Sequence, residues 1–151
     1  MPITSGSPAP NFSLKDDEGK LRTFSEYKGT KIVLYFYPKD DTPGCTTEAC
    51  NFRDDYNEYI DAGITILGVS PDSVKSHKEF REKFNLPFSL LADEDHKVSE
   101  AYGVWGKKKF MGKEYLGVLR TTFIIDETGR IDHVFEDVKP SDHSKEILSL
   151  L

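Results

Sequence analysis

The chain has 151 residues, of which 37% are hydrophobic and 30% charged, and its formal net charge is −6. This length suits a single domain, residues 1–151, and the acidic balance argues against nucleic acid or an anionic membrane as the main partner. The longest apolar run, IVLYFY, is far shorter than the roughly 20 residues of a membrane span. The opening MPITSGSPAP has no basic residue and no apolar stretch typical of a signal peptide, so we expect a cytoplasmic protein.

The first half of the chain predicts strands separated by one helix. In chain order we expect a β-hairpin, a strand buried on both faces, a helix and a second buried strand, at residues 11–24, 30–38, 45–63 and 64–70. The buried strands are predicted from continuous apolar, β-branched and aromatic runs, which are typical of the centre of a sheet. The helix is predicted from apolar residues at helical spacing, and Gly63 is placed to end it.

The second half continues this alternation. We expect a helix capped by Asp72. Val74, Phe80 and Phe84 would face the core from this helix, and His77 would lie at the edge of the core. A short strand, a short helix, a hairpin turning at DETG and a final helix follow, at residues 87–93, 96–104, 119–137 and 141–151. The chain therefore predicts a mixed α/β sheet with helices on its faces.

Both cysteines lie in one segment, YFYPKDDTPGCTTEAC, residues 35–50. The junction of strand, loop and helix places Cys45 near a helix N-terminus, where free N–H groups and the helix dipole stabilise an anion. Such a position lowers the pKa of a cysteine from about 8.5 toward 4–7 and so raises its reactive thiolate fraction. Pro43 and Gly44 suit a helix entry that another group approaches closely, and Thr42 offers a hydroxyl in the same pocket.

The spacing of the two cysteines restricts what they do together. On an ideal helix, residues five apart have α-carbons separated by roughly 8.7 Å and point about 140° apart. A disulfide needs about 4.4–6.8 Å, so Cys45 and Cys50 bridge only if the first turns unwind. Two inert buried cysteines are one alternative. A zinc site is the other, but nothing brackets the cysteines at ligand spacing and the histidines are scattered, at His77, His96, His133 and His143.

The segment from Pro38 to Cys45 resembles the peroxiredoxin signature, in which Thr or Ser follows the proline by four residues and the peroxidatic cysteine follows three later. With its second cysteine the segment is similar to the Q-type, or bacterioferritin comigratory protein, subfamily, and the likeness continues over residues 102–135. The resemblance implies a thioredoxin-like fold that reduces hydrogen peroxide or organic hydroperoxides with cysteine alone, without a cofactor or metal. It also implies a thioredoxin- or glutaredoxin-type dithiol as the electron donor.

The same resemblance implies roles for the two cysteines. Cys45 matches the peroxidatic nucleophile, and Cys50 matches the resolving cysteine of a Cys45–Cys50 disulfide formed within one chain. This cycle passes through a sulfenic acid that condenses with the second thiol before it is oxidised further. Because such a cycle needs no partner subunit, we expect a monomer.

The resemblance also implies a pocket around the sulfur. Thr42 matches the hydroxyl that contacts the peroxide and the thiolate, and Pro38 matches the proline that shields the pocket from water. Arg120 matches the arginine beside the thiolate. Together with backbone N–H groups, such an arginine and hydroxyl stabilise the charge that develops on the departing oxygen. Glu48 falls where the subfamily carries a glutamate, and we treat it, with Gly44, as a supporting residue.

Two other functions compete with a peroxidase. A thiol–disulfide oxidoreductase of the thioredoxin type would use Cys-x-x-Cys, whereas four residues separate the cysteines here. A redox sensor or holdase whose helix unwinds on oxidation is an additional role that the sequence leaves open. Repeated turnover with a thioredoxin system distinguishes a catalyst from a single-use sensor.

A basic cluster, Lys107 to Lys109 with Lys113, is interpreted as a solvated loop in an otherwise acidic chain. The neighbouring Trp105, Phe110 and Tyr115 either cover a groove near the cysteines or pack in the core.

Overall fold

In the computed structural model, which describes residues 2–150, one mixed sheet has the strand order β2-β1-β5-β4-β3-β8-β9. Its strands are β1 Ser13–Lys15, β2 Leu21–Thr23, β3 Lys31–Phe36, β4 Ile64–Ser70, β5 Ser89–Ala92, β8 Thr121–Ile125 and β9 Ile131–Phe135. Neighbours β3, β4 and β5 run parallel, and the other pairs are antiparallel. The expected mixed sheet, the N-terminal β1–β2 hairpin and the late β8–β9 hairpin are thus confirmed.

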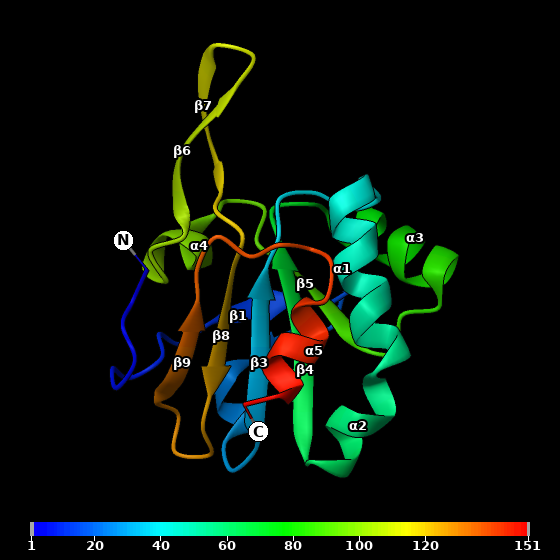
Figure 1. Cartoon of the computed structure of the whole chain (residues 1–151), viewed down its shortest axis with the longest axis vertical. Helices are drawn as coiled ribbons and strands as arrows, with labels where there is room; N and C mark the ends of the chain where they lie inside the picture. The colour runs from blue at the N-terminus through cyan, green and yellow to red at the C-terminus, as the bar shows by residue number, and fades with distance from the viewer. Residues whose placement is uncertain (1, 151) are drawn as a thin grey trace.

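Strand β3 lies inside the sheet, between β4 and β8, and both of its faces are covered. Ile32, Leu34 and Phe36 point into one core, which also contains Tyr102 and Phe123. The alternate residues of the same segment point into a second core with apolar residues of four helices, α1, α2, α3 and α5 (Figure 1). Two-sided burial explains why this strand reads as a continuous apolar run rather than an alternating one.

The helices are α1 Pro43–Asp54, α2 Tyr56–Asp61, α3 Val74–Phe84, α4 Lys97–Ala101 and α5 His143–Leu148, with a 3-10 turn η1 at Phe24–Tyr27. The single helix expected over 45–63 is wrong in one respect, because the backbone leaves helical geometry at Asp55 (φ −96°, ψ 7°). The Asp55 side chain makes no capping bond to the backbone and instead accepts a hydrogen bond from Lys145 Nζ of α5 at 2.8 Å. Gly63 follows α2 in the left-handed region (φ +74°), as expected of a helix-ending glycine. Leu151, expected on the last helix, lies outside the described residues.

Helix α3 differs from its prediction at both polar positions. Ser73, not Asp72, caps the helix, because its hydroxyl accepts a hydrogen bond from the Ser76 amide at 3.1 Å. The carboxylate of Asp72 instead accepts from the backbone amide of Asp40 at 2.7 Å. His77 is not at the edge of the core but fully buried, with 0% of its surface exposed. Phe80 is buried as expected.

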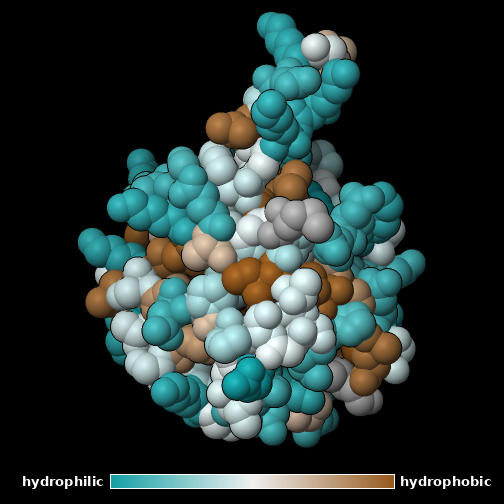
Figure 2. Space-filling view, turned by 90° about the vertical axis from the view of Figure 1, so that its left-hand side faces the viewer, coloured by the Kyte–Doolittle hydropathy of each residue, from teal (hydrophilic) through white to brown (hydrophobic). Residues whose placement is uncertain are grey.

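The basic segment after α4 is a projecting hairpin and not a loop. Strands β6, Trp105–Phe110, and β7, Lys113–Val118, pair with each other and stand out from the body, largely hydrophilic in surface (Figures 1 and 2). Met111 and Gly112 turn the chain with positive φ values of 52° and 79°. We refer to residues 105–118 as the arm.

The aromatic residues of the arm do not cover a groove near the cysteines. Phe110 and Tyr115 are exposed, at 66% and 47% of their surface. Trp105, at the base of the arm, stacks on His96 with ring centroids 4.0 Å apart. Within residues 2–150, no helix has both the length and the apolar character that crossing a membrane requires.

Candidate active site

The site lies where β3 ends and α1 begins. The chain leaves the sheet through residues 37–41, and the Thr42 carbonyl accepts the first helical hydrogen bond, from the Thr46 amide at 2.8 Å. Pro43 opens the helix, which places Cys45 at its third position. Cys45 is 1% exposed, and its side chain packs from α1 into the second core. The predicted placement of this cysteine at a helix N-terminus is confirmed.

Arg120, which lies 75 residues further along the chain, contacts Cys45. It directly precedes β8, which pairs with β3, so the sheet itself brings residue 120 to the end of β3. Its Nη2 donates to Cys45 Sγ at 3.2 Å, and its Nη1 donates to Glu48 Oε1 at 2.8 Å. One guanidinium therefore binds the sulfur and the carboxylate, as its planar fork of donors permits.

Glu48 is the second buried ionisable group of the site. The residue is 1% exposed, and its Oε2 has no hydrogen-bond partner among the described residues. Burial raises the pKa of Glu48 to about 7, while the charge and hydrogen bond of Arg120 act in the opposite direction. The pKa of Glu48 therefore lies close to neutral pH.

Replacing Glu48 by glutamine is expected to remove a pH dependence of stability. Because the pKa of Glu48 rises from 4.5 to about 7 on folding, the folded protein keeps a proton that the unfolded chain releases between these values. The stabilisation is complete below pH 4.5 and is lost as the pH rises through about 7. Urea unfolding of both proteins at several pH values from 5 to 8 measures this difference. The exposed Glu114→Gln variant is the control and should keep the wild-type pH dependence. If the free energy of unfolding changes with pH equally in Glu48→Gln and in wild type, the raised pKa of Glu48 is not the cause of that dependence.

Gly44 lies where two groups come close to the backbone. A Cβ at this position would stand 3.3 Å from Arg120 Nη2 and 3.3 Å from Pro140 Cγ. Both separations are tighter than ordinary van der Waals contact, so a larger residue would displace the arginine or the loop. The close approach expected at this helix entry is present, and Arg120 is one of the groups that make it.

Thr42 and Pro38 border the site without contacting the sulfur through a hydrogen bond. The Thr42 hydroxyl donates to the Lys39 carbonyl at 2.9 Å, and the residue is half-buried. Pro38 is half-buried and follows the fully buried Tyr37. The structure thus brings Cys45 and Glu48 into contact with Arg120, places Gly44 close to the same guanidinium, and places Thr42 and Pro38 in the loop before the helix.

Cys50 lies one and a half turns further along the same helix. It is half-buried, and both thiols are free. Burial raises the pKa of the Cys50 thiol, with a smaller lowering by Arg53. Because α1 is continuous from residue 43 to 54, the two sulfurs cannot bond in this conformation.

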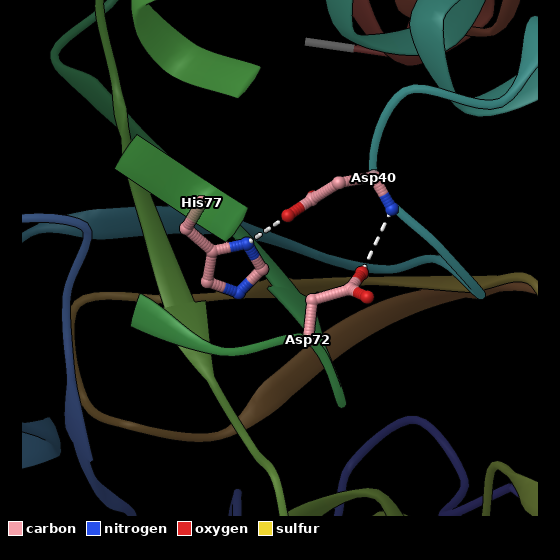
Figure 3. A group of neighbouring side chains, drawn as sticks. All are labelled: Asp40, Asp72 and His77. Carbon is pink, nitrogen blue, oxygen red and sulfur yellow. Dashed lines mark hydrogen bonds and ion pairs between the residues drawn. The ribbon is translucent and has the colours of Figure 1, made fainter. Parts of the chain in front are cut away.

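Asp40 and His77 form a buried pair beside this site that the sequence pattern did not indicate (Figure 3). Asp40 belongs to the segment of residues 35–50, but its position in that segment alone predicts no role for it. With Asp72 the pair brings potential metal-ligand atoms within 4.8 Å of one another. The signal that could have identified Asp40 was its position directly after a buried strand, where loop side chains often lie over the core.

Comparison with known proteins gives one family. The AhpC/TSA family matches residues 5–134 of this chain. Peroxiredoxin Bcp of Bacillus subtilis strain 168 is 52% identical over 151 residues, which cover 100% of this chain and 96% of the relative. Peroxiredoxin Bcp of Escherichia coli strain K12 is 47% identical over 150 residues, which cover 99% of this chain and 96% of the relative.

Solved structures give the same result for the fold. A mutant of Xylella fastidiosa PrxQ superposes with a TM-score of 0.93 at 34% identity, covering 99% of this chain and 96% of that one. The Xanthomonas campestris bacterioferritin comigratory protein, studied for its alkyl peroxide reduction activity, superposes with a TM-score of 0.90 at 36% identity. That match covers 97% of this chain and 96% of the other. The expected thioredoxin-like fold is confirmed.

Proposed function

This chain belongs to the AhpC/TSA family, with Bcp and Q-type peroxiredoxins as its relatives, and from that premise we propose how its own residues carry out peroxide reduction. The protein is a thiol peroxidase. The observation that carries the assignment of residues is the 3.2 Å contact from Arg120 Nη2 to Cys45 Sγ at the start of α1. The whole chain acts as one domain in this proposal, supported by the continuous seven-stranded sheet within the described residues 2–150.

In the first step Cys45 is the nucleophile. Its thiolate attacks the terminal peroxide oxygen, an S–O bond forms, the O–O bond breaks and the departing oxygen leaves as an alkoxide or hydroxide that takes a proton. Cys45 becomes a sulfenic acid. The Arg120 guanidinium, already directed at Sγ, stabilises negative charge on the sulfur and on the departing oxygen.

The pocket residues complete this step. Glu48 orients Arg120 through the 2.8 Å contact, and Gly44 leaves the room that the guanidinium occupies. A rotation of Thr42 away from the Lys39 carbonyl would offer its hydroxyl to the bound peroxide. Pro38 borders the pocket on the side of the loop and limits the access of water.

In the second step Cys50 resolves the sulfenic acid. Its thiolate attacks Cys45 Sγ, an S–S bond forms and hydroxide leaves as water once it is protonated. Because the helix separates the two sulfurs, its first turns must unwind before this step. An external dithiol then reduces the disulfide by exchange and restores both thiols.

Substrate and setting are proposed from the relatives and the site. The substrates are hydrogen peroxide and organic hydroperoxides, and the alkyl peroxide reduction activity of the Xanthomonas campestris relative supports the second class. The reductant is a dithiol protein of the thioredoxin or glutaredoxin type, and the cytoplasm supplies it, since a cysteine pair that must return to the thiol state needs a reducing compartment. A monomer is sufficient, because both cysteines belong to one helix.

Intact mass measurement tests this function. Reduced protein is mixed with one equivalent of hydrogen peroxide and quenched with an alkylating agent over seconds. We expect the mass to fall rapidly by about two hydrogens and neither thiol to be alkylated, which indicates a disulfide within the chain. Repeated consumption of peroxide with a thioredoxin system then separates a catalyst from a sensor. If both thiols stay open to alkylation for many minutes, the proposed peroxidase chemistry is wrong.

A further inference from the structure

A buried polar cluster holds the loop that leads to Cys45. The Asp40 side chain comes from this loop, His77 from α3, and Asp72 from the chain after β4, and the three lie together (Figure 3). Asp40 is 6% exposed and His77 0%. None of these groups has a role in the two chemical steps above.

Every contact of Asp40 in this cluster fixes the loop. Its Oδ1 accepts from the Tyr37 hydroxyl at 2.6 Å, and its Oδ2 accepts from the Ser76 hydroxyl at 2.8 Å. The same Oδ2 lies 2.7 Å from His77 Nδ1. The Asp40 amide donates to the carboxylate of Asp72 at 2.7 Å, and the Ser70 hydroxyl donates to that carboxylate at 2.7 Å. Main chain and side chain of Asp40 are therefore both anchored.

The geometry also locates protons on the histidine. His77 Nε2 lies 3.0 Å from the Leu91 carbonyl oxygen, which only accepts hydrogen bonds, so Nε2 carries a proton. The 2.7 Å separation of Nδ1 and Asp40 Oδ2 is that of a hydrogen bond, which requires a proton between them. The hydroxyls of Tyr37 and Ser76 donate to the carboxylate and favour its charged form. These contacts fit an imidazolium paired with a carboxylate within the core.

A metal ion is a less suitable explanation for the same residues. Asp40, Asp72 and His77 offer ligand atoms within 4.8 Å of one another. The contact between His77 Nδ1 and Asp40 Oδ2 is a hydrogen-bond distance, and hydroxyl donors already face both oxygens of Asp40. An ion would have to displace these donors.

The cluster lies very close to the reacting end of α1. Only Asp41, with a left-handed φ of 57°, separates Asp40 from Thr42, whose carbonyl starts the helix. The chain therefore passes from a fixed point in the core to the helix start within two residues. The position of Asp40 therefore restricts where Thr42 and, three residues further, Cys45 can lie.

We propose that the Asp40–His77 ion pair is a positioning clamp for peroxide reduction, which presents Cys45 to Arg120 and stays closed while α1 unwinds. The proposal rests on the peroxidase function proposed above. The clamp touches neither sulfur nor peroxide, and it acts through the loop of residues 40–42. The turns of α1 that unwind begin beyond residue 42, outside the clamp.

Two variants test the clamp, His77→Gln and Asp40→Asn. The asparagine keeps the shape of Asp40 and removes its charge. For each variant, stopped-flow measurements give the rate of Cys45 oxidation by peroxide and, separately, the rate of disulfide formation that follows. We expect oxidation to slow by about tenfold, since small displacements of a reacting group have large effects on rate. Disulfide formation should not slow, because the clamp does not oppose the unwinding of α1.

A matched control removes a different anchor of the same loop. Lys83 Nζ bonds Asp41 at 2.8 Å, but both side chains are largely exposed, so Lys83→Gln should leave both rates within twofold of wild type. A folded Asp40→Asn or His77→Gln protein that oxidises at the wild-type rate overturns the clamp. If wild type itself fails to react with peroxide, the peroxidase proposal fails instead, and the spectroscopic test below still decides the ion pair.

Nitrogen NMR of wild-type protein tests the clamp without a variant. We expect both ring nitrogens of His77 to carry protons at neutral pH, in the reduced and in the disulfide form alike. A bare Nδ1 would overturn the ion pair. If the His77 spectrum changes to that of a solvent-exposed imidazole in the disulfide form, the clamp opens during the cycle. That result would overturn the proposal that the clamp stays closed while α1 unwinds.

Discussion

Replacing Cys45 by serine is expected to abolish peroxide reduction, with a loss of at least about a thousandfold. A serine hydroxyl is a far weaker nucleophile than a thiolate and is almost entirely protonated at neutral pH. The fold should persist, because serine is nearly the same size and the site keeps its Arg120–Glu48 contact. Peroxide consumption with a dithiol reductant measures the loss, and circular dichroism checks the fold.

The Cys50→Ser variant is the matched counterpart of this change. It should still consume one equivalent of peroxide at the wild-type rate, since Cys50 is five residues from the reacting cysteine and the side-chain bonds of Arg120 go to Cys45 and Glu48. The product should remain a sulfenic acid or proceed slowly to sulfinic acid, because the chain holds no other thiol. If Cys50→Ser instead turns over as fast as wild type, Cys50 is not the resolving residue. If Cys45→Ser retains activity, Cys45 is not the nucleophile.

The sequence was most informative where local pattern determines structure. The apolar run of residues 30–38 predicted a central strand because a strand buried on both faces needs apolar residues at every position. Cys45 was placed at a helix start by the proline, glycine and change of period around it. Arg120 followed only from the resemblance, since nothing local indicates that a residue 75 positions away contacts the sulfur.

The errors arose where tertiary contacts decide the outcome. Asp72 is a residue type that often caps helices. Its carboxylate instead binds the Asp40 amide and the Ser70 hydroxyl, and Ser73 caps the helix. His77 shares a helical face with apolar residues, and its burial depends on an acid 37 residues away. The arm escaped prediction because two largely exposed strands that pair with each other need no buried apolar face.

Replacing Arg120 by glutamine is expected to slow the oxidation of Cys45 by about 10²–10³-fold. That range is typical for the loss of one donor that stabilises charge in a transition state. Arg120 supplies the charged donor closest to the sulfur, at 3.2 Å, and a neutral amide offers a weaker and shorter-reaching bond. Single-turnover oxidation by peroxide measures the effect, and the exposed Arg130→Gln variant should react as fast as wild type.

The buried charge of Glu48 allows a slower oxidation of Cys45 in Arg120→Gln to be distinguished from a loss of stability in the same variant. Without Arg120 the buried carboxylate loses its counter-ion, so the pKa of Glu48 should rise further and the Arg120→Gln protein should lose stability most at high pH. Adding Glu48→Gln removes the buried charge, so the double variant should regain stability while its oxidation remains slow. Arg120→Lys keeps the charge but cannot bond the sulfur and Glu48 together, and should be intermediate. Recovery of fast oxidation in the double variant would mean that Arg120 serves only to neutralise Glu48.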